Sequence, residues 1–449
     1  GWHTRAIAAY DRAIEIDPGF AGAYARRSIA RQLTREGRAE NDASNTLAKM
    51  DFELALALNP DNADALAAAG LYESDPDQAD RLLRRALEID PDLPNARSWY
   101  TTNLKRLGRF REANEIRAKH LSLDPLNPLI HTNSIVTRIN QGDYNSAKGL
   151  ALEAFLFPDE SFGGPYHSLF SVEMAFGEYA RGLAWILEAL LADSDPNSNY
   201  LLLAHADVSA VLGMFEEAHQ QTDLAVEKDR SQYETRLKIL FRQDDRSGLK
   251  MLTDTLAEDR DHRRIPFSID QHLGSLYLQL GEIHKAIDYL KPTFEGFNGV
   301  PLERSHFGPQ DDAMLYLVKA FLLAGREKDA HLLLRDLDDF YALMEREGVA
   351  GTPNRLVLMA LHKALSDREN EAFLLLGRAI DRGWADYYAL VNDARWDGLR
   401  DNPEFIALLA EAERELALER ELVINHRQTD SLDVVFASKT YQTATLIAH

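Results

Sequence analysis

The sequence predicts an all-α protein that folds as a solenoid, a right-handed superhelix of antiparallel helix pairs. The first observation is a recurring helix ending, in which an acidic or amide residue and a proline follow an Ala- and Leu-rich stretch: Asp17-Pro18, Asn59-Pro60, Asp90-Pro91 and Asp124-Pro125. The second is that these prolines recur at intervals of 42, 31 and 34 residues. A period near 34 is typical of stacked helix–turn–helix repeats. Such repeats bury their apolar faces against their neighbours and bind through an extended surface.

The first third of the chain shows the repeat most clearly. Ala6-x3-Tyr10, followed by Ala13, fits the second helix of a unit whose first helix is absent, so we expect the chain to be a fragment that lacks its natural N-terminal part. A second unit begins near Ala21 and has a long polar connection over residues 34–45. In the fourth unit Gly108 should end the first helix, because glycine adopts the left-handed conformation at least steric cost.

The later units follow the same pattern with interruptions. We group residues 1–158 as N-terminal units and 159–291 as central units, with a degenerate unit at 231–262. Residues 292–310 form a Gly-, Pro- and aromatic-rich loop insertion, which could close over a groove or simply pack on the adjacent repeat. Residues 311–422 hold the last units and a capping helix, and 423–449 an irregular tail. The best match to the pattern is Leu273-Gly274-x2-Tyr277.

Composition limits the classes of function. The chain has 50 Lys and Arg against 72 Asp and Glu, a net charge of −22, which disfavours nucleic acid and anionic membranes as partners. Residues 1–120 hold 18 basic and 19 acidic residues, so an anionic partner would more plausibly meet this part. The absence of cysteine excludes disulfides and thiolate metal sites and fits a cytoplasmic location. No signal peptide or membrane-spanning run is evident.

Motifs that carry catalysis or bind a cofactor or metal are absent from the sequence. There is no His-Glu-x-x-His, no Gly-x-Ser-x-Gly and no phosphate loop. His205 with Asp207, and His272 with His284, match no ligand spacing and are better explained as packing or surface residues. The acidic run at 258–262 could hold a divalent cation, but its interleaved arginine favours a solvated linker. We therefore expect no catalytic, cofactor or metal residues.

A partner-binding groove is the remaining candidate site. Polar residues of the first helices should line the concave face, where a peptide backbone or an acidic group could bind. Each could equally be an ordinary solvated position. The candidates are Asn95, Thr102, Lys105, Arg106, Thr132, Asn133, Asp207, Gln271, Ser275, Gln279 and Lys319.

These motifs identify the chain, by resemblance, as a tetratricopeptide-repeat (TPR) protein. The stretch from Ala394 to Leu409, with Asp124-Pro125-Leu126-Asn127-Pro128, also resembles the C-terminal TPR half of bacterial signalling proteins. In those proteins the N-terminal half is a class III adenylate/guanylate cyclase or a winged-helix domain. The resemblance implies a regulatory, partner-binding role beside an effector domain that is absent here.

Our leading hypothesis is a non-catalytic scaffold that binds a protein or peptide through its concave face. The alternatives are a cyclase's regulatory arm and a free-standing assembly scaffold. Self-association is a further expectation, because Ile7, Tyr10 and Ile14 belong to a half-unit without its partner helix.

Overall fold

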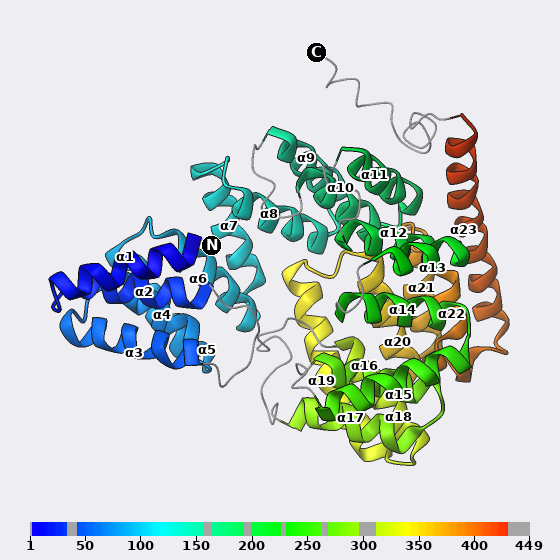
Figure 1. Ribbon diagram of the computed structural model, residues 1–449. Coiled ribbons are helices and arrows are strands. Elements are labelled where there is room, and N and C mark those ends of the chain that lie inside the picture. The colour runs from blue at the N-terminus through cyan, green and yellow to red at the C-terminus, as the bar shows by residue number, and fades with distance from the viewer. Residues whose placement is uncertain are drawn as a thin grey trace. The chain divides into compact units, whose positions relative to one another are not determined.

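The computed structural model describes residues 2–33, 43–156, 164–192, 199–225, 230–262, 268–295 and 311–429. Every regular element in these ranges is a helix, as the sequence predicts (Figure 1). The contacts divide the chain after Asp124 into two compact units. We call the part up to Asp124 unit 1 and the part from Pro125 onward unit 2. The division falls inside the group of residues 1–158 that the motifs suggested.

The described residues of unit 1 form one single helix followed by three helix pairs. Its helices are α1 (Trp2–Ile16), α2 (Ala21–Leu33), α3 (Ala43–Leu58), α4 (Ala63–Tyr72), α5 (Pro76–Ile89), α6 (Pro94–Arg106) and α7 (Phe110–Leu123). Each helix packs on its neighbours in repeat order, and α2, α4 and α6 pack on one another.

Small residues bring the helices of a pair together, as the sequence pattern predicts. Ala79 and Ala86 are fully buried at the contact between neighbouring helices. A Cβ atom at Gly70 on α4 would lie 2.6 Å from Cγ of Leu83 on α5, so the two helices approach more closely than alanine allows. Gly274 on α16 and Leu290 on α17 repeat this contact in unit 2. The spacing of alanine and glycine in the sequence therefore predicts where adjacent helices pack.

Unit 2 contains seven helix pairs within its described residues, followed by a different C-terminal part. The pairs are α8 (Pro128–Gln141) with α9 (Tyr144–Glu153), α10 (Gly164–Ala175) with α11 (Tyr179–Ala192), α12 (Asn199–Val211) with α13 (Phe215–Leu224), α14 (Arg230–Arg242) with α15 (Arg246–His262), α16 (Ser268–Gln279) with α17 (Ile283–Glu295), α18 (Asp311–Leu323) with α19 (Glu327–Glu347), and α20 (Pro353–Leu365) with α21 (Glu369–Ile380). A 3₁₀ turn η1 (Ala154–Leu156) follows α9. The C-terminal part comprises α22 (Tyr387–Asn392), the 3₁₀ helix η3 (Ala394–Leu399) and α23 (Pro403–Thr429).

Left-handed glycines mark the turns between the helices of a pair. Gly108 has a φ of +70°, which confirms the predicted helix end, and Gly142, Gly177, Gly213 and Gly281 occupy the same position in unit 2. In the pair expected to be degenerate, α14 and α15, the turn uses Asp244 with a φ of +52°. The helix pair persists there without its glycine because aspartate tolerates the left-handed region better than most residues.

Two helices extend beyond the ends expected from the sequence. α17 continues through Pro292 to Glu295, and Phe294 is buried on it. The rest of the expected insertion, residues 296–310, lies outside the described residues. α23 continues past Leu422 to Thr429, because Val423 packs in an apolar cluster and Arg427 binds Glu217. The remainder of the expected tail, from residue 430, also lies outside the described residues.

Candidate functional site: the face of the first helices

The first helices of successive pairs form the surface on which the expected groove should lie. In unit 1, α2 packs on α4 and α4 on α6. In unit 2, the same relation joins α8 with α10, α12 with α14, α16 with α18, and α18 with α20. The two units differ in what lies against this face.

In unit 2 the chain's own C-terminal residues lie against the first helices. We call residues 381–402, which include α22 and η3, the closing segment. α22 packs on α12 and α14 (Figure 1), and η3 packs on α18 and α20. Asp386 of this segment binds Arg242 at the end of α14 through both carboxylate oxygens, at 2.6 Å (Nη2) and 3.0 Å (Nε). Both side chains are largely buried.

Two further contacts of the closing segment are hydrogen bonds between a side-chain amide and the backbone. The amide nitrogen of Asn392 donates to the carbonyl oxygens of Phe241 and Arg242, at 3.2 Å and 2.9 Å, and so satisfies the end of α14. On α16, the side-chain oxygen of Gln279 accepts a 3.0 Å hydrogen bond from the backbone N–H of Ala394. Gln279 therefore binds a peptide backbone, and that backbone belongs to the same chain.

Arg395 connects the closing segment to α18. Its guanidinium donates to Asp393 at 2.7 Å and to Asp312 on α18 at 2.6 Å. It also stacks on the ring of Tyr316, with 3.7 Å between the guanidinium carbon and the ring centroid. Two carboxylates and an aromatic face surround this cation, which is the arrangement a buried arginine requires.

Two turns between paired helices are met by glycine backbone, one by the closing segment and the other by the turn before α20. A Cβ atom at Gly177, between α10 and α11, would overlap the carbonyl group of Gly383. Gly351, just before α20, donates its N–H to the carbonyl of Asn140 at 3.2 Å, and a Cβ at Gly142 would lie 2.7 Å from its carbonyl oxygen. The backbones touch at both places, so only glycine fits.

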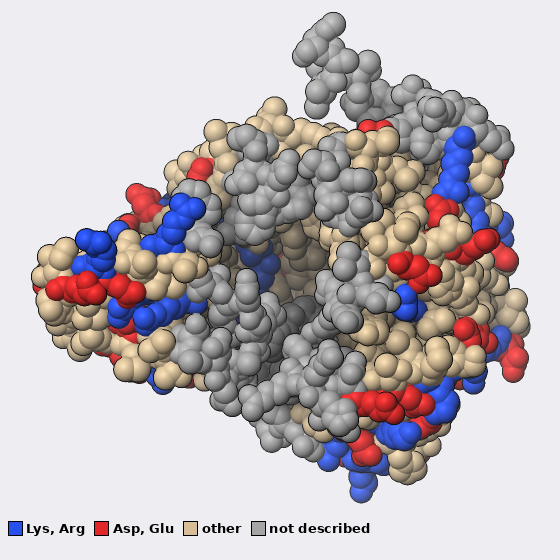
Figure 2. Space-filling model, in the orientation of Figure 1, with Lys and Arg blue, Asp and Glu red and all other residues tan. Residues whose placement is uncertain are grey.

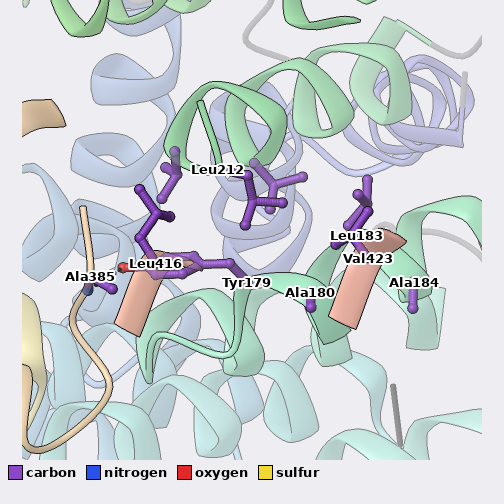
Figure 3. Packing of buried hydrophobic residues seen from close by; sticks show 10 residues of the cluster. Tyr179, Ala180, Leu183, Ala184, Leu212, Ala385, Leu416 and Val423 are labelled. Atoms are coloured by element: carbon purple, nitrogen blue, oxygen red, sulfur yellow. Dashed lines mark hydrogen bonds between the residues drawn. The ribbon is translucent and has the colours of Figure 1, made fainter. Parts of the chain in front are cut away.

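α23 completes the closure of unit 2. Figure 3 shows Leu416 and Val423 of α23 packed with Tyr179 and Leu183 of α11 and with Ala385 of the closing segment. The carboxylate of Glu419 accepts a 2.8 Å hydrogen bond from the backbone N–H of Ala180 at the start of α11. An anion at this position is favoured by the helix dipole.

The candidate residues of unit 2 are mostly engaged within the unit. Besides Gln279, Asp207 binds Lys238 at 2.7 Å, and the Ser275 hydroxyl donates to the carbonyl of His272. Burial lowers the pKa of Lys319, although the nearby Asp397 and Asp393 oppose that shift. The remaining three candidates are partly buried on α8 or α16: Thr132, Asn133 and Gln271.

In unit 1 the four candidates all lie on α6. Asn95 is partly buried, and Thr102 is exposed with its hydroxyl bonded to the carbonyl of Ser98. Arg106 is buried and donates to the carbonyl oxygens of Glu73 and Ser74, so it holds the turn before α5. Lys105 is partly buried, and its side chain makes no hydrogen bond or ion pair with the described residues. Burial, and then the charge of Arg117, lower the pKa of Lys105 to about 7.

Sequence reasoning missed the residues that hold the closing segment, namely Arg242, Asp386, Asn392 and Arg395. The stretch from Ala394 to Leu409 was recognised as distinctive, and the structure gives a packing reason for it. Trp396 is buried and stacks on Phe405 with 5.4 Å between ring centroids. The residues that hold the closing segment bind partners far away in the sequence, as Arg242 binds Asp386 and Arg395 binds Asp312, so no local pattern indicates them.

Other clusters of titratable groups are satisfied inside the fold. His205 bonds to Glu217 at 2.8 Å, and Arg427 binds the same carboxylate at 2.6 Å. Lys148 and Tyr144 both bond to the buried carboxylate of Glu173. Among the described residues there is no group of three or more ligating side chains that could hold a metal ion. Within the same residues, no helix combines the length and apolar character needed to cross a membrane.

Comparison with known proteins supports the repeat. A tetratricopeptide repeat matches residues 271–291. This match covers α16 and the start of α17, where the sequence analysis placed its best unit. No curated protein matches the chain.

Three solved structures resemble the chain at low identity. A structure of pilF from Pseudomonas aeruginosa is 17% identical, covers 53% of this chain and 90% of its own, and has a TM-score of 0.29. A monomeric mutant of IFIT1 solved with Gppp-AAAA is 14% identical over 80% of this chain and 85% of its own, with a TM-score of 0.35. A structure of Naa15/Naa10 bound to HypK-THB is 12% identical, covers 99% of this chain and 67% of its own, and has a TM-score of 0.29. Similarity at this level identifies no partner or activity for this chain.

Proposed function

We propose that the chain is a non-catalytic scaffold that binds a protein partner on the first helices of unit 1. The observation that supports this is the difference between the two units. In unit 2 the equivalent face is engaged by the closing segment, through Arg242, Gln279 and Asp312. In unit 1 the main packing of the described helices is with the next helix in the chain or with the first helix of the next pair, and Thr102 on α6 stays exposed.

Side chains along one side of α6 would make the first contact with the partner. Asn95, Thr102 and Lys105 follow one another at helical spacing, so they lie on one side of α6. Helical repeats bind partners along such rows because each unit adds one position to a continuous surface.

Site-specific photo-crosslinking tests this proposal. A photoreactive residue at Thr102 should capture a defined polypeptide that the same residue at Thr255 does not capture. Thr255 on α15 is a matched control, because it too is exposed and bonds its hydroxyl to a carbonyl one turn earlier. Equal capture at both positions, or capture at Thr255 alone, would contradict the proposal.

Self-association through α1 remains a proposal of the same kind. Ile7 and Tyr10 are only partly buried, and α1 packs mainly on one helix, α2. Analytical ultracentrifugation at high concentration, with Ile7→Ser/Tyr10→Ser as the variant, would detect a dimer that the variant loses. A strict monomer would remove this proposal.

A regulatory role in a bacterial signalling protein rests on the resemblance of the stretch from Ala394 to Leu409. Packing accounts for Trp396 and Phe405 without any effector domain. The coding sequence upstream of Gly1 discriminates the alternatives. Metal-binding aspartates there would support the regulatory arm of a cyclase, and a basic recognition helix would support a winged-helix protein. A short leader would support a free-standing scaffold.

A further inference from the structure

His362 on α20 is fully buried between helices of unit 2, with 0% of its surface exposed. Its Nε2 lies 2.9 Å from the carbonyl oxygen of Leu334 on α19. Because a carbonyl oxygen can only accept, Nε2 carries the proton of the neutral ring. The other ring nitrogen, Nδ1, is buried without a hydrogen-bond partner among the described residues. The ring is therefore held as a neutral imidazole, and a second proton would have to sit on this bare nitrogen.

The carboxylate beside this ring already binds two cations. Oδ1 of Asp338 on α19 lies 3.8 Å from Nε2 of His362. The same oxygen accepts from Nζ of Lys363 at 3.0 Å and from the guanidinium of Arg368 at 2.8 Å. Figure 2 shows the more usual arrangement on the drawn face of unit 2, where most Lys and Arg lie beside Asp and Glu. A protonated His362 would instead be a third cation beside one carboxylate, so Asp338 cannot neutralise it.

Carboxylates on the other elements packed against α20 have partners of their own. Asp311 of α18 accepts a 2.9 Å hydrogen bond from the hydroxyl of Tyr341 and pairs with Arg355 of α20. Others on α18, η3 and α21 are bound by a cation or an amide: Asp312 by Arg395, Asp397 by Arg400, Glu369 by Asn402, and Glu371 by Arg368. Among the described residues, Asp338 is thus the one carboxylate within 4 Å of the ring nitrogens of His362.

α20 also supports the closing segment. Near the start of this helix, Oδ1 of Asn354 accepts a 2.9 Å hydrogen bond from the indole N–H of Trp384, which is buried. The carbonyl oxygen of Gly351, just before α20, accepts from Arg382 at 3.0 Å, and η3 packs on the helix itself. A movement of α20 away from α19 would therefore disturb contacts that hold the closing segment.

We propose that His362 makes the contact between α19 and α20 an acid-sensitive latch, which loosens the closing segment when the ring is protonated. A proton on Nδ1 places a buried charge between the two helices, where the described residues provide it with no acceptor. The contact then opens more often, and α20 and the closing segment loosen together. Opening uncovers the first helices of unit 2, which the closing segment otherwise engages. This inference concerns unit 2 and does not depend on a partner of unit 1.

The direction of the pH dependence follows from the surroundings of the ring. Burial lowers the pKa of His362, and the charges of Lys363 and Arg368 add to that shift, while Leu334 and Asp338 oppose it. In the opened state the ring reaches water and regains the ordinary value of about 6.5, so this state binds the proton more readily. Opening is therefore favoured increasingly as the pH falls below about 6.5. Free carboxylates titrate near pH 4, so this window lies above theirs.

The test is amide hydrogen exchange of the full chain at about pH 7.5 and pH 5.5, with each rate corrected for the intrinsic pH dependence of exchange. Protection of α20 and of residues 381–402 should fall roughly tenfold at the lower pH, because the open state binds a proton that the closed state excludes. α5 in unit 1 is the internal reference and should keep its protection. The readout has to be local, since burial also lowers the pKa of His131 and of His167.

Three variants assign the effect to the ring. His362→Gln keeps an N–H donor for the carbonyl of Leu334 but cannot titrate, so it should abolish the acid loss. His331→Gln is the matched control, because His331 is exposed on α19 and its replacement should leave the native behaviour unchanged. Arg368→Gln frees part of Asp338 for the imidazolium and should reduce the acid loss to a few-fold. This last variant keeps the test decisive if His362→Gln fails to fold.

Several outcomes would overturn the inference. These are equal protection of native α20 at both pH values, an acid loss in His362→Gln as large as in the native chain, or an undiminished loss in Arg368→Gln. A fall of the same size in α5 would mean that acid unfolds the chain generally, without a latch. If α20 loosens while residues 381–402 keep their protection, the histidine does not control the closing segment and the latch is wrong.

Discussion

The two units of this chain use the same helix pairs and differ in what holds the pairs together. In unit 1 each pair packs on the next, through α2 with α4 and α4 with α6, and the main contacts of the described helices stay between adjacent pairs. In unit 2 the closing segment and α23 contact helices from α11 to α20. Unit 2 therefore has long-range contacts that a chain of repeats does not need.

The comparison shows how the first helices of the two units differ in what they contact. The first helices of unit 2 bind an extended piece of their own chain, using a bidentate arginine at Arg242, a backbone contact from Gln279 and a carboxylate from Asp312. The first helices of unit 1 keep a polar row with an unneutralised Lys105. In unit 2 closure engages this surface within the chain, whereas in unit 1 it is the surface on which we propose that a partner binds.

The largest effect is expected at the glycine contact that closes unit 2. Gly177→Ala should destabilise unit 2 by about 4 kcal/mol, because the left-handed backbone and the clash with Gly383 add up. Gly281→Ala is the matched control: it has the same φ but no atom within 4 Å of the added Cβ, so only about 1 kcal/mol should be lost. Urea denaturation followed by circular dichroism measures both. Similar losses would show that the closing contact adds nothing.

The ion pair between Arg242 and Asp386 should have the next largest effect. Arg242→Ala leaves the carboxylate of Asp386 buried without its partner, at a cost of about 3 kcal/mol. In unit 1 the exposed pair of Arg85 and Asp61 offers the contrast, and Arg85→Ala should change stability little. Hydrogen exchange of α22 and η3 would localise the change. Protection that is unaltered in Arg242→Ala would mean that the closing segment is held by other contacts.

Acid should loosen the contact between α13 and α23. Burial alone would raise the pKa of Glu217, but hydrogen bonds from His205 and Arg427, together with their charges, outweigh burial and lower the pKa to about 2. Since this value lies below that of a free glutamate, the stabilisation is full above about pH 4.3 and is lost as the pH falls toward 2.

Glu217→Gln should therefore remove about 2 kcal/mol at pH 7 and flatten the loss of stability between pH 5 and 2. Glu216→Gln, on the exposed neighbour, is the control and should leave the acid profile unchanged. Thermal melts across this pH range give the comparison. Identical profiles for the two variants would remove Glu217 from the closure of unit 2.

The smallest effect is expected in unit 1 and has the opposite sign. Lys105→Met should stabilise the chain at pH 6, because it removes a partly desolvated cation next to Arg117. The gain should be only about 1 kcal/mol, since the ammonium keeps some contact with water. A lysine whose folded pKa is lowered costs most below about pH 7, and the cost shrinks as the pH rises toward its unfolded value. The gain should therefore fade by pH 9.

Lys49→Met is the control for this gain. Lys49 is exposed and pairs with Glu53, so its removal should not stabilise the chain. Chemical denaturation at pH 6 and pH 9 separates the two variants. A pH-independent gain at Lys105 would point to packing in place of charge.

The sequence alone determined the helix pairs, because their contacts lie within one or two repeats. Alanines at fixed spacing and Gly108 at a turn report on neighbours about 34 residues away, and the match at 271–291 agrees with this pattern. Helix ends were less well determined: Val423 extends α23 only because residues far away in the chain cover it.

Only the tertiary structure decided which surfaces stay available. Arg242 and Asp386 are 144 residues apart, and Ala180 and Glu419 are 239 residues apart, so no local pattern announces either contact. The physical reason is that helix packing within a repeat depends on the shape of adjacent side chains, whereas closure depends on where the accumulated turn of many repeats brings the chain. The candidate groove residues lie on the first helices, but the sequence could not show that Gln279 already has the chain itself as its ligand.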